Sequence, residues 1–371
     1  MEIVDRGLIW DESACTDGRA AASFVALCAA SDGALYASFR RGSAKNSPDG
    51  VGTVCRSEDE GRSWRVVCDT LEAVPKDVSG QLVTASCYEA EPGRLGCFIT
   101  LFETRPDSRL YDSSDDSLLP SHLLLADSTD RGESWGDVRA ADTHGLPGCS
   151  ATGSTCLLAD GRVVLPFESY GARPGSEERV HAACAFLMGA DGDPGEPLVI
   201  ASDPEHRVYY WDQRLALCGR TGPPVAMFWT YDRRAEEDLP IHIAWGSADG
   251  LTWEEPRSTG IAGQIAQPIR LPDGRLACFY VHRHAPPSMR LALSADEGRT
   301  WDLDGELVVH DAAADAVRRG DGGYTDYWDE MFTWTFGHPA GLVLPGGELL
   351  LAHYGGASPE HLSIHWAHVR V

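Results

Sequence analysis

Short apolar runs of the length expected for β-strands recur along the whole chain, and turn-forming residues separate them. Six times, such a run is followed by a glycine-containing turn and a second run, as in residues 24–39. The glycines of these six turns are Gly33, Gly93, Gly161, Gly222, Gly274 and Gly347. Long segments with the period of an amphipathic helix are absent, while Gly (39) and Pro (22) are abundant. The pattern predicts an all-β chain built from six strand–turn–strand segments.

A second repeat follows four of these segments and reads Ser-x-Asp-x-Gly-x-Ser/Thr-Trp. Its copies begin at Ser57, Ser128, Ser247 and Ser294, and the third copy is one residue shorter than the others. The Asp and Ser/Thr side chains can bond nearby backbone N–H groups and Gly accepts a positive φ, so the pattern is typical of a tight turn. Each copy follows an apolar run and ends in a Trp that can be buried. We therefore expect a second hairpin in these segments.

Two hairpins per segment give four strands, so the sequence predicts a six-bladed β-propeller with four antiparallel strands in each blade. Residues 1–371 are expected to form this single domain, because one ring of six blades accounts for the length. The last segment ends with the run 364–371. An early strand such as Ile3-Val4 or Leu8-Ile9 is expected to pair with it, which would close the ring and remove exposed edges.

The four repeated turns resemble the Asp boxes, or bacterial neuraminidase repeats, of the sialidase (neuraminidase) superfamily, and the six segments resemble its six-bladed propeller. The resemblance covers nearly the whole chain. It implies a carbohydrate-active enzyme with a central pocket, although a fold by itself does not fix the chemistry.

Counting from the turn glycines, we sought the family's functional residues one by one. Its first arginine, third arginine and nucleophilic tyrosine fall on Ser23, Pro287 and His338, which depart from the family's pattern. Asp49 is similar in placement to its acid/base aspartate, and Asp212 is the nearest match to its catalytic glutamate. The resemblance therefore implies a sialidase-like glycosidase and leaves standard sialidase activity doubtful.

The connections on the face opposite the hairpin turns are expected to build the pocket, because two of them per blade reach that face. Asp49 and Asp212 are the expected acid and base. His338 either takes the place of the usual tyrosine or serves as a base, and Tyr327 in the preceding loop could also reach the centre. The remaining candidates would bind substrate, and they are Arg40, Arg41, Glu103, Glu168, Arg214, Arg233, Gln267, Arg283 and Tyr354.

Each main candidate also has a purely structural interpretation. Asp49 lies in Ser-Pro-Asp-Gly, a typical turn sequence. Asp212 and Arg214 alternate on one strand and could form an ion pair. His338 could bond the backbone of a neighbouring blade, and Arg283 could be a solvated loop charge.

Two other features bear on the pocket. His282 and His284 share a strand face, which is compatible with a metal, but such pairs are more often unmetallated, so neither a metal nor a cofactor is expected. The connection before His338, about 25 residues, is longer than ordinary loops. It is rich in aromatic residues, including Trp328 and Trp334, and is predicted to fold over the mouth as a partial lid.

Composition narrows the class of ligand. The formal net charge is −25, which argues against nucleic acids and anionic membrane surfaces as partners. No apolar stretch is long enough to span a membrane and no secretory signal is visible, so a cytoplasmic protein is expected. The 11 cysteines are scattered without Cys-x-x-Cys pairs, which fits a reduced compartment. The composition makes no prediction of oligomeric state.

Three functional hypotheses follow. The first is hydrolysis of a glycosidic bond in a small acidic saccharide by acid/base chemistry in the central pocket. The second is a lyase that acts on a uronic acid with a His or Tyr base. The third is a non-catalytic sugar-binding propeller.

Overall fold

The computed structural model describes residues 1–71, 80–103, 110–112, 114, 116–173, 175–216, 223–312 and 324–371, and for residues 137 and 324–327 it describes the backbone only. Strands dominate this part of the chain. The described helices are the 3-10 turn η1 (Glu12–Ala14) and the short helix α1 (Tyr324–Met331). No described helix is long and apolar enough to cross a membrane.

In chain order, the described strands can be grouped into six units whose strands pair antiparallel, and the first and sixth units join in one sheet through a single parallel pair, Ala21 opposite Leu362. The first unit contains β2 (Ala21–Ala29), β3 (Leu35–Gly42), β4 (Val51–Ser57) and β5 (Arg65–Leu71). The second contains β6 (Gln81–Glu91), β7 (Arg94–Phe102), β10 (Ser121–Ser128) and β11 (Gly136–Ala140). The third contains β12 (Ser150–Ala151), β13 (Cys156–Leu157), β14 (Val163–Ala172), β15 (Arg179–Met188) and β16 (Leu198–Ser202). Its first strand is split, because β12 and β13 both pair with β14.

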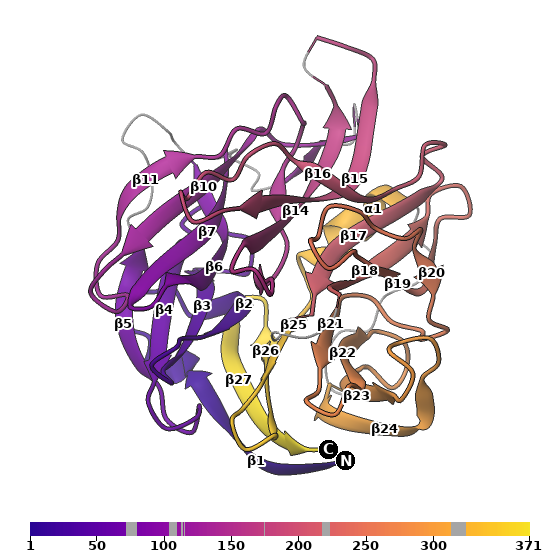
Figure 1. Cartoon of the computed structure of the whole chain (residues 1–371). Coiled ribbons are helices and arrows are strands. Elements are labelled where there is room, and N and C mark those ends of the chain that lie inside the picture. Colours follow the sequence, from indigo (N-terminus) through magenta and orange to yellow (C-terminus); the bar gives the residue numbers. More distant parts are fainter. Residues whose placement is uncertain are drawn as a thin grey trace.

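The other three units follow the same plan. The fourth contains β17 (Val208–Leu215), β18 (Val225–Asp232), β19 (Glu237–Trp245) and β20 (Arg257–Ser258). The fifth contains β21 (Ala266–Arg270), β22 (Leu276–His282), β23 (Ser288–Ser294) and β24 (Asp302–Asp311). The sixth contains β25 (Phe336–Val343), β26 (Leu349–Ser358), β27 (His361–Arg370) and β1 (Glu2–Trp10). Figure 1 shows the units arranged around a common centre, with the first strand of each nearest to it.

The N-terminal strand completes the last unit. β1 pairs antiparallel with β27, from Glu2 opposite Arg370 to Trp10 opposite Ile364. The two chain ends lie side by side in Figure 1. This pairing of an early strand with residues 364–371 was predicted from the sequence and is confirmed. A small hairpin of β8 (Tyr111–Asp112) and β9 (Ser117–Leu118) lies outside the six units.

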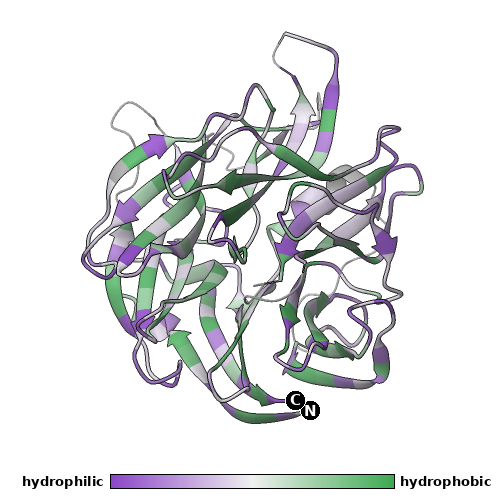
Figure 2. Ribbon diagram, viewed as in Figure 1, coloured by the Kyte–Doolittle hydropathy of each residue, from purple (hydrophilic) through white to green (hydrophobic). Residues whose placement is uncertain are grey.

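The hydrophobic core lies between neighbouring units, because each strand presents every second side chain to the adjacent sheet. Met227 and Ile243 of the fourth unit, for example, pack in one buried cluster with Leu276 and Cys278 of the fifth. Figure 2 shows hydrophobic residues along the strands and hydrophilic ones at the connections. Packing between successive units therefore fixes where the first strand of each unit begins and ends.

The repeated turns have the hydrogen bonds that the pattern predicts. In the first copy, Ser63 N donates to Asp59 Oδ1 (2.9 Å) and Gly61 N donates to Ser57 Oγ (2.9 Å). Trp64 Nε1 donates to Gly61 O (2.8 Å), which fixes the ring over the turn. The copy beginning at Ser128 has the same set of bonds. The Ser, Asp and Trp side chains of the repeat therefore bond within their own turn, which is a structural role.

We expect Asp59→Ala to lower the free energy of unfolding by about 1 kcal/mol, because the turn loses its hydrogen-bond acceptor. These bonds lower the pKa of Asp59 to about 2. A depressed pKa stabilises the fold above the ordinary value near 4, and this contribution is lost as pH falls towards 2. Urea unfolding should therefore show the variant converging with the parent at acid pH. Asp304→Ala, at an exposed position on β24, is the control and should change stability by less than about 0.5 kcal/mol.

Candidate functional site

A cavity of about 130 Å³ lies where the first strands of the units begin. Phe24 comes from β2, Asp212 from β17 and His338 from β25, so distant parts of the chain meet there. The charged side chains in its wall are Lys45, Glu168, Asp212 and Arg283, and the aromatic ones include Phe24, Trp229, Trp328, Trp334 and Tyr354. This combination of stacking surfaces and charged groups is typical of a small-ligand site.

Three of the strands that enter the cavity each contain one residue with an unusual backbone conformation. Phe24 (φ 58°), Asp212 (φ 45°) and His338 (φ 56°) adopt left-handed backbone angles, which are rare for residues other than glycine. Each lies at a break in the pairing of its strand with the next one, in β2, β17 and β25 respectively. Such bulges redirect side chains and are common beside active sites. Here they place three non-glycine side chains in the cavity wall.

Glu168 and Asp212 form a pair of acidic groups in the cavity. Asp212 N donates to Glu168 Oε2 at 3.0 Å, which brings the end of one side chain to the backbone of the other residue. Burial, and then the neighbouring charge of Asp212, raises the pKa of Glu168 to about 8. Burial also raises the pKa of Asp212, while Arg214 opposes that rise. Two buried acids this close resist ionising together, so the pair tends to keep one proton near neutral pH.

Arg214 links Asp212 to His338. Its side chain is 1 % exposed, and Nη1 donates to the backbone oxygen of Asp212 (3.0 Å) and approaches Asp212 Oδ1 (3.4 Å). Arg214 Nη2 lies 2.8 Å from His338 Nε2, and His338 Nδ1 lies 3.3 Å from Val25 O. The arginine can only donate, so His338 accepts at Nε2 and donates to Val25 from Nδ1. Burial and the Arg214 charge hold the pKa of His338 well below its usual range.

This geometry bears on the role of His338. Both ring nitrogens have partners, and the lone pair that a base would use is turned to Arg214. The arrangement supports a neutral imidazole that fixes Arg214 beside Asp212. Both structural alternatives for these residues are present, namely the ion pair of Asp212 with Arg214 and the contact of His338 with Val25 of the first unit. Asp212 and His338 line the cavity, whereas Arg214 lies behind them and is not a lining residue.

Arg283 is held by a chain of polar groups that starts at the edge of the fourth unit. Asp238 accepts from Trp229 Nε1 (2.8 Å) and from Gln264 Nε2 (3.1 Å). Gln264 Oε1 in turn accepts from Arg283 Nε (3.1 Å), and Phe336 O accepts from Arg283 Nη2 (2.8 Å). The guanidinium lies 3.9 Å from the centroid of the Trp334 ring. A positive group is thereby fixed in the aromatic part of the cavity.

Three more residues of the predicted set line this cavity beside Arg283 and Asp212, namely His338, Tyr354 and Glu168. Tyr354, on β26, is buried, and burial raises its pKa to about 12. Glu168, on β14, was expected only to bind substrate, yet its carboxylate accepts a hydrogen bond from the backbone N of Asp212.

The connection before β25 contributes side chains to the cavity, as the predicted lid would. Trp328 and Met331 of α1, and Phe332 and Trp334 after it, line the cavity. The Trp328 ring stacks on Tyr111 with centroids 4.6 Å apart and an interplanar angle of 5°. This stack anchors α1 to the small β8–β9 hairpin. The side chain of Tyr327 lies outside the described residues.

Two predicted site residues, Asp49 on the β3–β4 connection and Arg40 near the end of β3, serve other contacts. Asp49 accepts from Ser43 N (3.1 Å) and lies 3.8 Å from Arg19 Nε. Although burial opposes the shift, hydrogen bonds from Ser47 and Ser43 lower the pKa of Asp49, which suits a turn more than a proton donor, and Asp49 is not among the cavity-lining residues. Arg40 is fully buried and donates to four backbone oxygens of Leu82, Ala44, Lys45 and Ser47. Its guanidinium shapes the connection and does not line the cavity.

Four more predicted residues lie away from the cavity. Arg41 points to the other side of β3, where it contacts Thr53, Asp17 and Asp69. Gln267 donates to Leu215 O and so ties the fifth unit to the fourth. Arg233 pairs with Glu236 at 3.2 Å, and Glu103 is exposed.

The sequence places His282 and His284 on one strand face, where a metal was considered. The rings of His282 and His284 are 5.7 Å apart, and His282 Nδ1 contacts Pro286 O. Within the described part of the chain, no three His, Cys, Asp or Glu side chains are placed to hold a metal ion.

Sequence analysis missed Lys45, Phe24 and Trp229 as cavity residues. Lys45 is 4 % exposed, and its Nζ donates to Met331 O, the last carbonyl of α1, at 2.6 Å. Burial and then Arg283 hold its pKa well below the usual range of a lysine. A signal for Lys45 was present, because lysine is very rare in this sequence.

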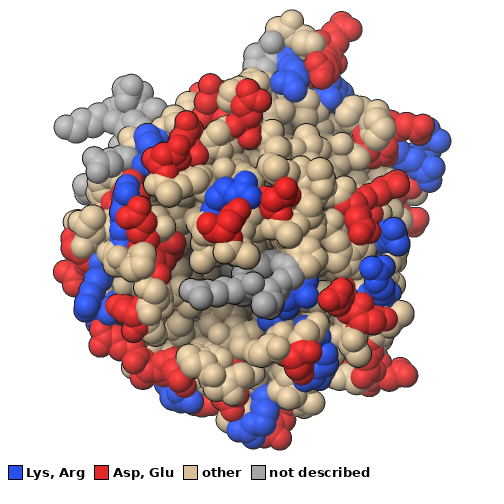
Figure 3. Space-filling view, in the orientation of Figure 1, with Lys and Arg blue, Asp and Glu red and all other residues tan. Residues whose placement is uncertain are grey.

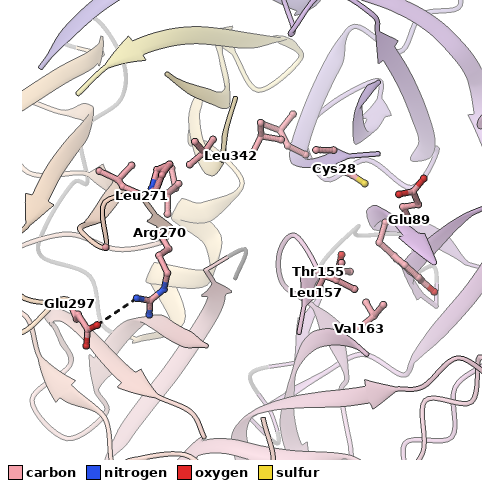
Figure 4. Close-up of a pocket in the computed structure, with 16 residues that line it drawn as sticks. Cys28, Glu89, Thr155, Leu157, Val163, Arg270, Leu271, Glu297 and Leu342 are labelled. Carbon is pink, nitrogen blue, oxygen red and sulfur yellow. Dashed lines mark ion pairs between the residues drawn. The ribbon is translucent and has the colours of Figure 1, made fainter. Parts of the chain in front are cut away.

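A second cavity, of about 730 Å³, lies at the other ends of the first strands, where the hairpin turns are. Figure 4 shows Arg270 directed to Glu297 of the fourth repeated turn, an ion pair of 3.9 Å. The other acidic residue that lines this second cavity is Glu89, whose carboxylate accepts a hydrogen bond from Ser31 N (2.7 Å). Leu157, Val163 and Leu342 dominate the rest of the view. The repeated turns therefore belong to the end away from the paired carboxyl groups.

The face shown in Figure 3 carries no continuous basic patch among its described residues. Acidic side chains are spread over the same face. This distribution agrees with the net charge of −25.

No family model matches the sequence, and a search of curated proteins finds no match. Solved structures do match in fold. A protein of unknown function from Dyadobacter fermentans has a TM-score of 0.70 at 17% identity over 100% of this chain and 99% of that one. The intramolecular trans-sialidase from Ruminococcus gnavus, in complex with oseltamivir carboxylate, gives 0.65 at 11% identity over 100% and 98%.

A third match is the alpha-L-arabinanase from Penicillium chrysogenum complexed with arabinobiose, with a TM-score of 0.62 at 13% identity over 100% and 98% of the two chains. At these identities the similarity shows the fold alone. This chain has a sialidase-like, β-propeller-like all-β fold, one that is also found in glycoside hydrolases.

Proposed function

We propose that this protein hydrolyses the glycosidic bond of a small acidic saccharide in the cavity at the strand entries. The observation that carries the proposal is the pair formed by Glu168 and Asp212, two acids with different surroundings in one aromatic-lined cavity that also holds Arg283. Glycoside hydrolysis uses two carboxyl groups, one protonated and one charged.

The roles follow from the surroundings of each group. Glu168 keeps its proton at neutral pH and would donate it to the leaving oxygen. Asp212, beside Arg214, would act as the carboxylate that attacks or activates water. His338 would hold Arg214 in place through Nε2. Arg283 would bind the acidic group of the sugar, and Trp229 and Trp334 would offer their faces to the ring.

This assignment changes the acid/base pair expected from the sequence. Asp49 contacts Ser43 and Arg19 outside the cavity. We therefore assign the role of proton donor to Glu168 in place of Asp49. We also propose that the six units are blades of one closed six-bladed propeller over residues 1–371. The four-strand units and the pairing of β1 with β27 support that proposal.

The test is a panel of chromogenic or fluorogenic glycosides that includes uronides, sialosides and neutral pentosides. We expect release of the aglycone from an acidic glycoside and its loss in Asp212→Asn. Ultraviolet absorbance of an unsaturated uronide would instead identify a lyase. If calorimetry detected saccharide binding while no member of the panel was turned over, the non-catalytic hypothesis would replace this proposal.

A further inference from the structure

The chain contains only two lysines, Lys45 and Lys76, among its 31 Lys and Arg residues. Arginine therefore supplies almost every positive side chain. Lys76 lies outside the described residues, whereas Lys45 lies in the wall of the cavity. Arginine would serve equally well or better to bind an anion, because its guanidinium is a fixed fork of donors. A lysine at this one position suggests a task that a guanidinium cannot perform.

The surroundings of Lys45 are apolar and positively charged. Its Nζ lies 5.3 Å from the ring centroid of Tyr354, 5.4 Å from that of Trp334 and 5.9 Å from that of Phe24. Arg283 lies over the same Trp334 ring. Burial and this neighbouring cation both favour the neutral amine, while Asp212 and the faces of the three rings favour the charged form. A buried lysine beside another cation is a known way to activate an amine as a nucleophile.

Hydrogen bonds also hold the backbone of Lys45 in place. The backbone oxygen of Lys45 accepts from Arg40 Nη1 at 2.7 Å, and its backbone N donates to Pro359 O at 2.8 Å. Arg40 is a buried residue of β3, and Pro359 lies in the turn between β26 and β27. The side chain therefore enters the cavity from a held backbone, which lowers the entropy lost when a ligand binds.

We propose that Lys45 is a reactive amine that forms an imine with small carboxylic acids that carry an adjacent aldehyde or ketone. Arg283 would bind the carboxylate, which places the neighbouring carbonyl carbon at the amine. The reaction would take place in the cavity proposed for hydrolysis and would share Glu168, Asp212 and Arg283 with it, but it does not require that a glycoside is cleaved there.

The chemistry uses only groups of this cavity. The neutral Nζ attacks the carbonyl carbon and gives a carbinolamine. Glu168, which keeps its proton at neutral pH, donates to the departing hydroxyl, and Asp212 can accept the proton that the nitrogen loses. The carbonyl oxygen leaves as water with one hydrogen from the amine and one from Glu168, the second amine hydrogen goes to Asp212, and a carbon–nitrogen double bond replaces the carbon–oxygen one. Transfer of a proton from Asp212 to Glu168 restores both acids. No oxidant or reductant takes part.

The competing explanation is a permanently charged Lys45. An ammonium group would also donate to Met331 O and would be favourable at the carboxyl end of α1. Such a group cannot attack a carbonyl. The two explanations therefore differ in the reactivity of the nitrogen.

The experiment is reductive trapping of the folded wild-type protein at neutral pH with glyoxylate and cyanoborohydride, followed by intact-mass measurement and peptide mapping. Free Nα-acetyl-lysine in the same tube provides a reference amine. We expect one carboxymethyl group on Lys45, at a rate at least about tenfold above the reference, since each unit of lowered pKa raises the neutral fraction about tenfold. Lys76→Arg should keep this label and Lys45→Arg should lose it, with circular dichroism confirming that both are folded.

A second arm tests recognition of the acid. Acetaldehyde replaces glyoxylate, and Arg283→Gln is compared with the parent. The variant should lose most of the preference for glyoxylate while its labelling by acetaldehyde persists. Trapping at Lys45 no faster than at the reference amine, or equal labelling by the two aldehydes in the parent, would overturn the proposal. Because the trapping experiment uses no glycoside, its result can be interpreted even if the protein hydrolyses no glycoside.

Discussion

Arg40→Met is expected to lower the free energy of unfolding by about 3 to 5 kcal/mol. The fully buried guanidinium donates to the backbone oxygens of Leu82 (3.0 Å), Ala44 (3.0 Å), Lys45 (2.7 Å) and Ser47. Methionine can fill much of the volume but donates no hydrogen bond. Four carbonyl groups would be left without this donor, each at a cost of about 1 kcal/mol. Urea unfolding, followed by fluorescence, measures the change.

Two further variants separate charge from geometry. Arg40→Lys keeps the charge, but a single ammonium group cannot reach all four carbonyls, so only part of the stability should return. Arg62→Met removes an arginine that is 48% exposed and should change stability by less than about 0.5 kcal/mol. Equal losses in Arg40→Met and Arg62→Met would show that Arg40 does not support the connection.

The architecture was largely predictable because it depends on local patterns. Alternating apolar runs and turn residues give strands and hairpins directly, as the Ser57–Trp64 turn shows. The pairing of β1 with β27 followed from an incomplete last segment and the need to cover an exposed strand. None of these inferences required knowledge of which side chain faces the centre.

The site was less predictable because it depends on which charged side chains point inward. Arg40 and Arg41 are neighbours on β3, yet one bonds the connection after its strand and the other points to Asp17 and Asp69. Period-two alternation explains that difference, but it does not give the partners of either side chain. The bulge at Asp212 interrupts that alternation within β17.

Lys45 and Glu168 show two different causes of error. Glu168 was named as a binding residue, and its high pKa arises from burial and from Asp212, which belongs to another unit. That effect exists only after folding. Lys45 occupies an ordinary loop sequence, and the usable signal was the near absence of lysine elsewhere. Residue rarity is thus a cue that hydrophobic patterning does not contain.

Glu168→Gln is expected to reduce turnover by about 10²- to 10⁴-fold, the usual contribution of a positioned proton donor. In the parent, the rate should fall as pH rises through about 8, because burial and the charge of Asp212 set the pKa of Glu168 there. Glutamine has no proton to lose, so this alkaline limb should be absent from the residual rate of the variant. Initial rates on the substrate found in the glycoside panel, measured from about pH 5 to about pH 9, give both quantities.

The same substitution makes a prediction about stability that needs no substrate. A carboxyl group whose pKa is raised on folding stabilises the protein below its unfolded value near 4.5, and this contribution is lost as pH rises through about 8. Glu168→Gln should therefore be more stable than the parent at about pH 9 and closer to it at about pH 5. Glu103→Gln, at an exposed position, should follow the parent at both pH values. A parent that showed no loss of stability relative to Glu168→Gln on the alkaline side would mean that Glu168 is already charged at neutral pH, and it could not then be the proton donor.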